Sequence, residues 1–110
     1  MANSVDVKTA YELQQSGIPI YDVREPEEFN SGHAQDAISI PLTELGERYT
    51  EIPQDQEVLI ICKSGGRSGQ ACDALEQAGY KVTNVAGGSL DWFGEKLPFV
   101  SESEEEPTVI

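Results

Sequence analysis

The sequence predicts an α/β protein with a mostly parallel sheet of about five strands and helices on both faces. Short apolar and β-branched segments alternate along the chain with segments of helical periodicity, which is the pattern of parallel strands joined by crossover helices. A chain of 110 residues, of which 38% are apolar, is long enough for one domain with its own hydrophobic core. In sheets of this kind, functional sites lie beyond the carboxyl ends of the strands.

The first half of the chain is expected to form three strands and three helices. The expected strands are residues 5–7, 18–23 and 37–40. Thr9 is placed to cap a first helix that runs to about Ser16, and Gly17 follows as a stop signal. Pro26 suits the first turn of a second helix, because its ring already has a helical φ. A third helix is expected around residues 42–48.

The second half of the chain contains the clearest strand and the clearest helix. Residues 57–61 are predicted to form the central strand of the sheet, because residues 58–61 are an apolar run. Residues 68–78 carry apolar side chains on one helical face and end before a glycine, which is a typical stop. Residues 81–85 are expected to form the last strand, and Ser89 is placed to cap a short helix after it.

The chain carries a net charge of −13, which argues against nucleic acid and anionic membranes as partners, since both favour basic surfaces. Residues 101–110 contain four glutamates, and we expect them to form a disordered tail behind a domain of residues 1–100. No segment has the length of a membrane span, and the N-terminus lacks a signal-peptide pattern. We therefore expect a cytoplasmic protein, in which two cysteines do not indicate a disulfide framework.

The most informative segment is residues 58–68, where an apolar strand ends in Cys62 and a glycine-rich turn leads into a helix. This order places a thiol beside backbone N–H groups, the positive end of a helix, and the cations Lys63 and Arg67. All three features stabilise a thiolate and a bound anion. The segment therefore predicts a nucleophilic cysteine that acts on a small oxyanion, rather than a cysteine that only fills the core.

The residues after this cysteine are the candidate substrate-binding residues: Lys63, Ser64, Gly65, Gly66, Arg67 and Ser68. The glycines allow the backbone to curl with its N–H groups directed inward. The forked guanidinium of Arg67 can bind two oxygens of a sulfonate-like or phosphate-like group, and a cation at a helix start is otherwise unfavourable. Lys63 could steer the anion or point into solvent, and Ser68 could bind the anion or cap the helix.

Other candidate residues carry less weight. Cys72 lies ten residues after Cys62, which is about 15 Å along a helix and beyond disulfide reach, so a dithiol oxidoreductase is disfavoured. The single histidine, His33, is expected to be structural rather than a catalytic base. No histidine and cysteine cluster has metal-ligand spacing, and the glycine-rich turn lacks the Lys-Ser/Thr ending of a nucleotide-binding loop.

Several short motifs, in their order and spacing, resemble the rhodanese (thiosulfate sulfurtransferase) domain in its single-domain form. The resemblance covers about residues 4–100. Its motifs are Asp22-Val23-Arg24-Glu25, Glu28-Phe29, Gly32-His33, Ala37-Ile38-Ser39-Ile40-Pro41, Cys62-Lys63-Ser64-Gly65-Gly66-Arg67-Ser68, Gly87-Gly88, Trp92 and Leu97-Pro98. The chain departs from the family at Asp36, where glycine is usual, and at Asp91, where alanine is common. The resemblance implies a rhodanese-like α/β fold.

The resemblance also implies a mechanism that needs no cofactor and no metal. In that mechanism the Cys62 thiolate attacks the outer sulfur of thiosulfate, sulfite leaves, and a Cys62 persulfide remains. The implied partners are a small anionic sulfur donor and a thiophilic acceptor, which is cyanide, a thiol or a protein. Asp22 and Arg24 are implied to tie the neighbouring strand end to the loop. We expect the protein to be a monomer.

Two other functions fit the same cysteine loop. One is a phosphatase or arsenate reductase, because the dual-specificity phosphatases share this fold and use a Cys…Arg loop. Four residues separate Cys62 from Arg67, whereas those relatives have five, and the smaller ring suits a sulfur atom better than a tetrahedral phosphate. The other is a non-enzymatic binding module or sulfur carrier, for which the acidic surface favours a basic partner.

Overall fold

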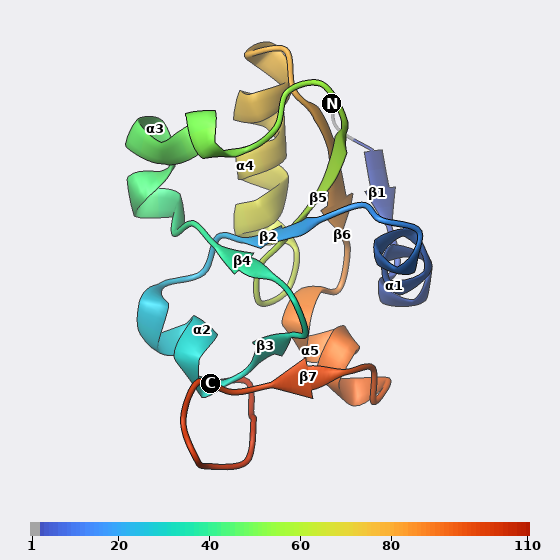
Figure 1. The fold of residues 1–110 in the computed structure, drawn as a ribbon, viewed down its shortest axis with the longest axis vertical. Coiled ribbons are helices and arrows are strands. Elements are labelled where there is room, and N and C mark those ends of the chain that lie inside the picture. Colours follow the sequence, from blue (N-terminus) through green and yellow to red (C-terminus); the bar gives the residue numbers. More distant parts are fainter. Residues whose placement is uncertain (1–2) are drawn as a thin grey trace.

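A parallel sheet of five strands lies at the centre of the molecule (Figure 1). The computed structural model describes residues 3–110. The strands lie in the order β1-β6-β5-β2-β4, and every neighbouring pair is parallel. Their bounds are Asn3–Val5 (β1), Ile20–Asp22 (β2), Ile38–Ser39 (β4), Glu57–Ile61 (β5) and Lys81–Val85 (β6). The predicted α/β class, with a parallel sheet of about five strands, is therefore confirmed.

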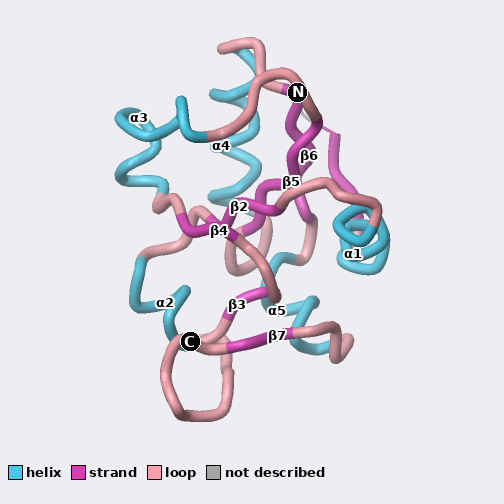
Figure 2. The backbone as a smooth tube through the Cα atoms, in the orientation of Figure 1, coloured by secondary structure: helices cyan, strands magenta, loops and turns pink. Residues whose placement is uncertain are grey.

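Helices connect these strands and cover both faces of the sheet (Figure 2). Their bounds are Val7–Gln15 (α1), Pro26–Ser31 (α2), Leu42–Glu44 (η1), Leu45–Arg48 (α3), Tyr49–Glu51 (η2), Gly66–Gln77 (α4) and Gly88–Gly94 (α5). The single helix predicted over 42–48 is instead two short helices, η1 and α3, in a segment that contains the poor helix former Gly46, and η2 follows them. Within residues 3–110, no helix has the length and apolar character needed to cross a membrane.

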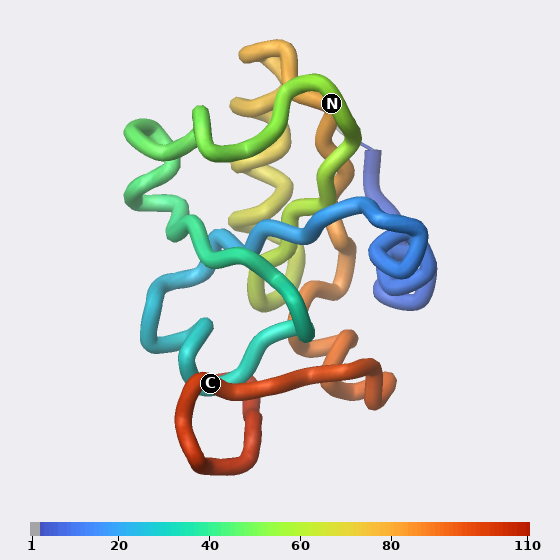
Figure 3. The backbone as a smooth tube through the Cα atoms, viewed as in Figure 1, coloured from blue at the N-terminus to red at the C-terminus, as the bar shows by residue number. Residues whose placement is uncertain are grey.

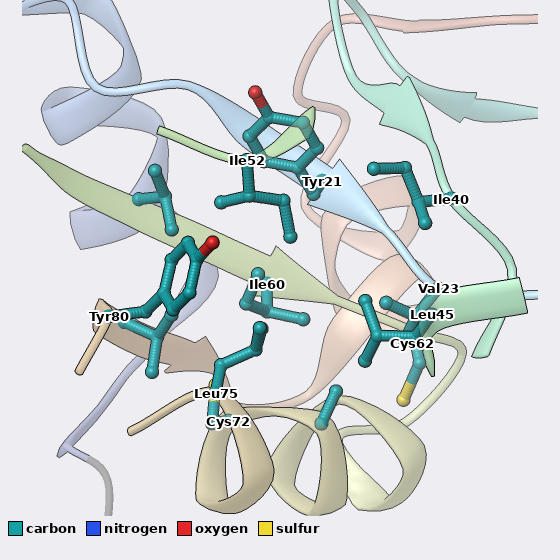
Figure 4. Packing of buried hydrophobic residues seen from close by; sticks show 13 residues of the cluster. Tyr21, Val23, Ile40, Leu45, Ile52, Ile60, Cys62, Cys72, Leu75 and Tyr80 are labelled. Atoms are coloured by element: carbon teal, nitrogen blue, oxygen red, sulfur yellow. The ribbon is translucent and has the colours of Figure 1, made fainter. Parts of the chain in front are cut away.

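Side chains of β5 alternate between two hydrophobic clusters, one on each face of the sheet. Val58 and Ile60 pack with α3 and α4, whereas Leu59 and Ile61 pack with α1, α2 and α5. The alternation follows from the strand pleat, and residues 58–61 of β5 are all apolar and buried because both faces of the strand are covered there. Cys62 lies at one end of the first cluster (Figure 4), so the core itself positions this side chain.

The caps of α1 and α5 differ from the predicted ones. α1 begins at Val7 because the carboxylate of Asp6 accepts a hydrogen bond from Thr9 N at 2.8 Å. Thr9 is therefore the donor in this cap and not the capping residue, and the first strand lies two residues earlier than predicted. α5 begins at Gly88, one residue before the predicted cap, Ser89.

Two short strands that the sequence analysis did not predict form a separate antiparallel pair, β3 (His33–Ala34) with β7 (Phe99–Val100). Residues 101–110 follow β7 and contain no helix or strand. They pass beside α2 (Figure 3), where Thr108 N donates a hydrogen bond to Ser31 O at 2.9 Å. The boundary of the domain and the disorder of this tail stay predictions.

Candidate functional site

Cys62 directly follows β5, and the next residues curl into a turn that leads into α4. Gly65 makes this turn possible, because its φ of 104° is a left-handed conformation that favours glycine. α4 begins at Gly66, two residues earlier than predicted, so Arg67 and Ser68 lie in its first turn. The free N–H groups of a helix start and of the turn before it therefore lie near the thiol.

The Cys62 sulfur lies in a buried and hydrogen-bonded position. Cys62 is 1% exposed, and its Sγ accepts hydrogen bonds from Gly65 N at 3.1 Å and from the Ser68 hydroxyl at 3.3 Å. Burial alone would raise the pKa of this thiol. The Ser68 hydroxyl and the N–H groups of Ser68, Gly65 and Ser64 outweigh burial and lower the pKa below its ordinary value. The site therefore favours a thiolate through hydrogen bonds.

Asn84, which the sequence analysis did not single out, holds the turn from the neighbouring strand β6. Its Oδ1 accepts a hydrogen bond from the Ser68 hydroxyl at 2.5 Å, and its Nδ2 donates one to Gly65 O at 3.2 Å. The Ser68 hydroxyl has a single proton, so it can donate to Asn84 or to Cys62 but not fully to both. Asparagine is depleted in strands, so an asparagine within the predicted strand 81–85 was the one sign in the sequence that Asn84 has a special role.

The guanidinium of Arg67 is held by Glu28 of α2. Nη1 of Arg67 lies 2.7 Å from Oε1 of Glu28, and Nη2 lies 2.9 Å from Oε2. These hydrogen bonds lower the pKa of Glu28 to about 2 and raise that of Arg67. The ion pair explains how α4 tolerates a cation in its first turn. The fork that was expected to bind a substrate anion is thus engaged by a carboxylate.

The remaining predicted binding residues lie at the rim of the turn. Ser64 and Gly66 are exposed, and Lys63 is half-buried. Within residues 3–110, the Lys63 ammonium has no ion-pair partner. Lys63 is therefore the loop cation that remains available to a ligand.

The first residues of α5 hold the turn through backbone hydrogen bonds. Ser89 N donates a hydrogen bond to Cys62 O at 2.9 Å, and Leu90 N donates one to Lys63 O at 3.1 Å. A Cβ atom on Gly88 would lie 2.5 Å from both of these carbonyl oxygens. Only glycine therefore allows α5 to approach the turn this closely.

Asp22 and Arg24 form a fully buried ion pair at the carboxyl end of β2. Arg24 Nη2 lies 2.7 Å from Asp22 Oδ2, and neither side chain is exposed. The same Nη2 donates a hydrogen bond to Gly32 O at 2.8 Å, at the end of α2. The Asp22–Arg24 pair thus fixes the end of α2, the helix that carries Glu28. The pair is therefore connected to the Cys62 turn through the ion pair of Glu28 with Arg67.

The other two candidate reactive side chains, His33 and Cys72, lie where they pack against the rest of the protein. His33 stacks on Phe29, with ring centroids 3.8 Å apart, and its Nδ1 lies 2.9 Å from Ala34 O. Cys72 is a buried, free cysteine of α4, and burial raises the pKa of its thiol to about 12. In the part of the chain that the structure describes, no group of three or more His, Cys, Asp or Glu side chains could hold a metal ion.

Comparisons with known proteins agree on one family. The profile of the rhodanese-like domain matches residues 6–95. The chain is 36% identical over 104 residues to a sulfurtransferase of Allochromatium vinosum, which covers 92% of this chain and 97% of the relative. It is 40% identical over 121 residues to thiosulfate sulfurtransferase 18 of Arabidopsis thaliana, which covers 96% and 88%. The structure of a rhodanese-related protein from Thermoplasma volcanium matches with a TM-score of 0.83 and 34% identity, over 89% of this chain and 97% of that chain.

Proposed function

Because this chain belongs to the family of rhodanese-like domains, we propose that it is a sulfurtransferase and that Cys62 carries the transferred sulfur. The observation that carries this proposal is the hydrogen bonding of the Cys62 sulfur by Gly65 N and the Ser68 hydroxyl. Donors placed in this way stabilise a thiolate nucleophile. They also stabilise a persulfide, whose negative charge lies one sulfur atom further out.

In the first half-reaction, the Cys62 thiolate attacks the outer sulfur of thiosulfate or of a related small anionic donor. The sulfur–sulfur bond of the donor breaks, and its electron pair leaves with sulfite. The new bond makes a Cys62 persulfide, which carries the same single negative charge as the starting thiolate. Lys63 at the rim of the turn is placed to attract the donor, and the N–H groups of the turn receive the charge of the persulfide.

In the second half-reaction, a thiophilic acceptor attacks the outer sulfur of the persulfide and restores the Cys62 thiolate. Cyanide gives thiocyanate, a small thiol gives its own persulfide, and a protein thiol gives a protein persulfide. Because the donor product leaves before the acceptor reacts, the kinetics are expected to be ping-pong.

The geometry favours sulfur transfer over phosphate hydrolysis. A phosphatase of the Cys…Arg type needs its arginine for the oxygens of the transferred phosphoryl group. Here both terminal nitrogens of Arg67 bind Glu28, and only four residues lie between Cys62 and Arg67. A ring of this size accommodates a single sulfur atom more readily than a tetrahedral phosphate.

Steady-state kinetics of thiocyanate formation from thiosulfate and cyanide test this proposal. The wild-type protein is expected to give parallel double-reciprocal plots, Cys62→Ser to give no turnover, and Cys72→Ser to keep wild-type turnover. Cys72 is the matched control because it is the other buried, free cysteine. Thiocyanate formation by Cys62→Ser at the wild-type rate would overturn the proposal.

A further inference from the structure

Arg67 lies in the first turn of α4, next to the turn that follows Cys62, but the two nitrogens that could bind an anion are already bound to Glu28. Nη1 and Nη2 each bind one oxygen of the same carboxylate, at 2.7 and 2.9 Å. This bidentate geometry is also the one in which an arginine binds two oxygens of a sulfonate-like anion. Glu28 and an anionic sulfur donor therefore compete for the same two nitrogens.

The helix α2 holds Glu28 in place for this contact. Glu28 is the third residue of α2, and its Oε1 also accepts a hydrogen bond from Glu25 N at 3.0 Å, which completes a capping box. Its side chain is 17% exposed. A carboxylate that is already fixed by its helix loses little additional side-chain entropy when it binds an arginine. An incoming anion must displace this preorganised partner.

No other arginine in residues 3–110 can take over the role of Arg67. Arg24 is buried against Asp22, and Arg48 binds two carboxylates of its own segment. The net charge of the chain is −13, so the wider electrostatic field repels anions as well. Lys63 is the one cation of the turn that has no carboxylate partner among the described residues.

We propose that Glu28 is a specificity-determining residue that disfavours doubly charged sulfur donors. Because it occupies Arg67, a dianion such as thiosulfate meets a single available cation and the repulsion of a fixed carboxylate. A donor with one negative charge experiences about half of that repulsion. The favoured donor class is therefore singly charged organic sulfane-sulfur compounds, such as thiosulfonates. This inference rests on the proposed function and names its substrate class.

A pair of donors that differ by one charge tests the inference. Thiosulfate has two negative charges and releases sulfite, whereas methanethiosulfonate has one and releases methanesulfinate. Both form the same Cys62 persulfide by cleavage of one sulfur–sulfur bond. The wild-type protein is expected to have the lower KM for methanethiosulfonate. A lower KM for thiosulfate would overturn the inference without any variant.

Glu28→Gln removes the charge and keeps an oxygen that can accept the hydrogen bond from Glu25 N. Its KM for thiosulfate is expected to fall about fivefold, which corresponds to about 1 kcal/mol, while the KM for methanethiosulfonate changes less than about twofold. Glu27→Gln is the matched control, since Glu27 lies on the same helix, is exposed and is not a partner of Arg67. It is expected to change neither constant.

A double-mutant cycle separates competition for Arg67 from a general structural role. In an Arg67→Gln background, the fivefold effect of Glu28→Gln on thiosulfate is expected to shrink to less than about twofold. An equal change for both donors, or a higher KM for thiosulfate in Glu28→Gln, would show that Glu28 only holds the turn, and would overturn the inference. A wild-type protein that forms no persulfide with either donor would instead contradict the proposed function.

Discussion

The Ser68 hydroxyl, in the first turn of α4, lies 3.3 Å from the sulfur of Cys62, within hydrogen-bond distance. Burial raises the pKa of the Cys62 thiol, and the Ser68 hydroxyl makes the largest contribution in the opposite direction. Ser68→Ala is therefore expected to raise this pKa, because the thiolate loses a hydrogen bond that stabilises its charge. The pH dependence of alkylation of Cys62 measures the change, and a smaller thiolate fraction near neutral pH is expected to slow the reaction.

The matched control is Ser89→Ala, because Ser89 is the other fully buried serine of the described chain and its hydroxyl has no hydrogen-bond partner there. This variant is expected to keep the wild-type pH profile of alkylation and a free energy of unfolding no lower than that of the wild type. An unchanged profile for Ser68→Ala would mean that the backbone N–H groups alone hold the thiolate.

The ion pair of Glu28 with Arg67 predicts a pH-dependent contribution to stability. The pKa of Glu28 is lowered from 4.5 to about 2 in the folded state, so its contribution is complete above pH 4.5 and is lost as the pH falls toward 2. We expect wild type to exceed Glu28→Gln by about 1 kcal/mol in free energy of unfolding at pH 7, after allowance for solvent screening. Urea titrations between pH 7 and pH 2.5 measure the difference, which should shrink only below pH 4.5. A difference that stays constant with pH would contradict the assignment.

The buried pair of Asp22 and Arg24 predicts a large loss of stability when only one partner is removed. Asp22→Asn leaves the Arg24 guanidinium buried without a compensating charge. The expected loss is about 3–5 kcal/mol in free energy of unfolding, measured by urea titration. Glu51→Gln, which removes one partner from an exposed ion pair of Arg48, is the control and is expected to have a small effect. Similar losses of unfolding free energy in the two variants would contradict the claim that burial makes the Asp22–Arg24 pair the more costly one to break.

Residue 88 must be glycine because α5 packs closely against the turn that follows Cys62. Its φ is 56°, and a Cβ atom would lie 2.5 Å from the carbonyl oxygens of Cys62 and Lys63. Gly88→Ala is therefore expected to lose about 2 kcal/mol or more of stability and to slow persulfide formation, because the turn must shift. Gly94→Ala on the same helix is the control, since nothing lies within 4 Å of its added Cβ. It is expected to be neutral or slightly stabilising in thermal unfolding, and equal melting temperatures for the two variants would contradict this account.

Local sequence patterns were sufficient to predict the central strands of the fold. β5 and β6 have the predicted bounds, 57–61 and 81–85, because each is a run of strand-forming residues between turn signals. β3 and β7 have two residues each and depend on pairing between distant segments, so no local pattern marks them. Asp36 has a φ of 68°, a left-handed conformation that glycine adopts more readily than other residues, and glycine is the residue that the resemblance predicted at this position.

The candidate site could be predicted only as far as its residues are neighbours in sequence. The order of strand, cysteine, glycines and helix located the turn around Cys62, and the structure places these residues together. Glu28 is 39 residues away from Arg67, and Asn84 is 16 residues away from Ser68. Contacts of that separation depend on how α2 and β6 pack against the turn. The unfavourable position of a cation at the start of α4 was a correct signal for a nearby anion, but that anion is a side chain of the same protein.

Mass spectrometry of the protein after incubation with thiosulfate tests the central claim most directly. The account predicts that the peptide with Cys62 gains the mass of one sulfur atom, that cyanide removes this mass, and that the peptide with Cys72 is unchanged. Cys62→Ser provides the control and is expected to gain no mass. No gain on Cys62 with either thiosulfate or methanethiosulfonate, together with turnover of an aryl phosphate, would contradict sulfur transfer and favour a phosphatase.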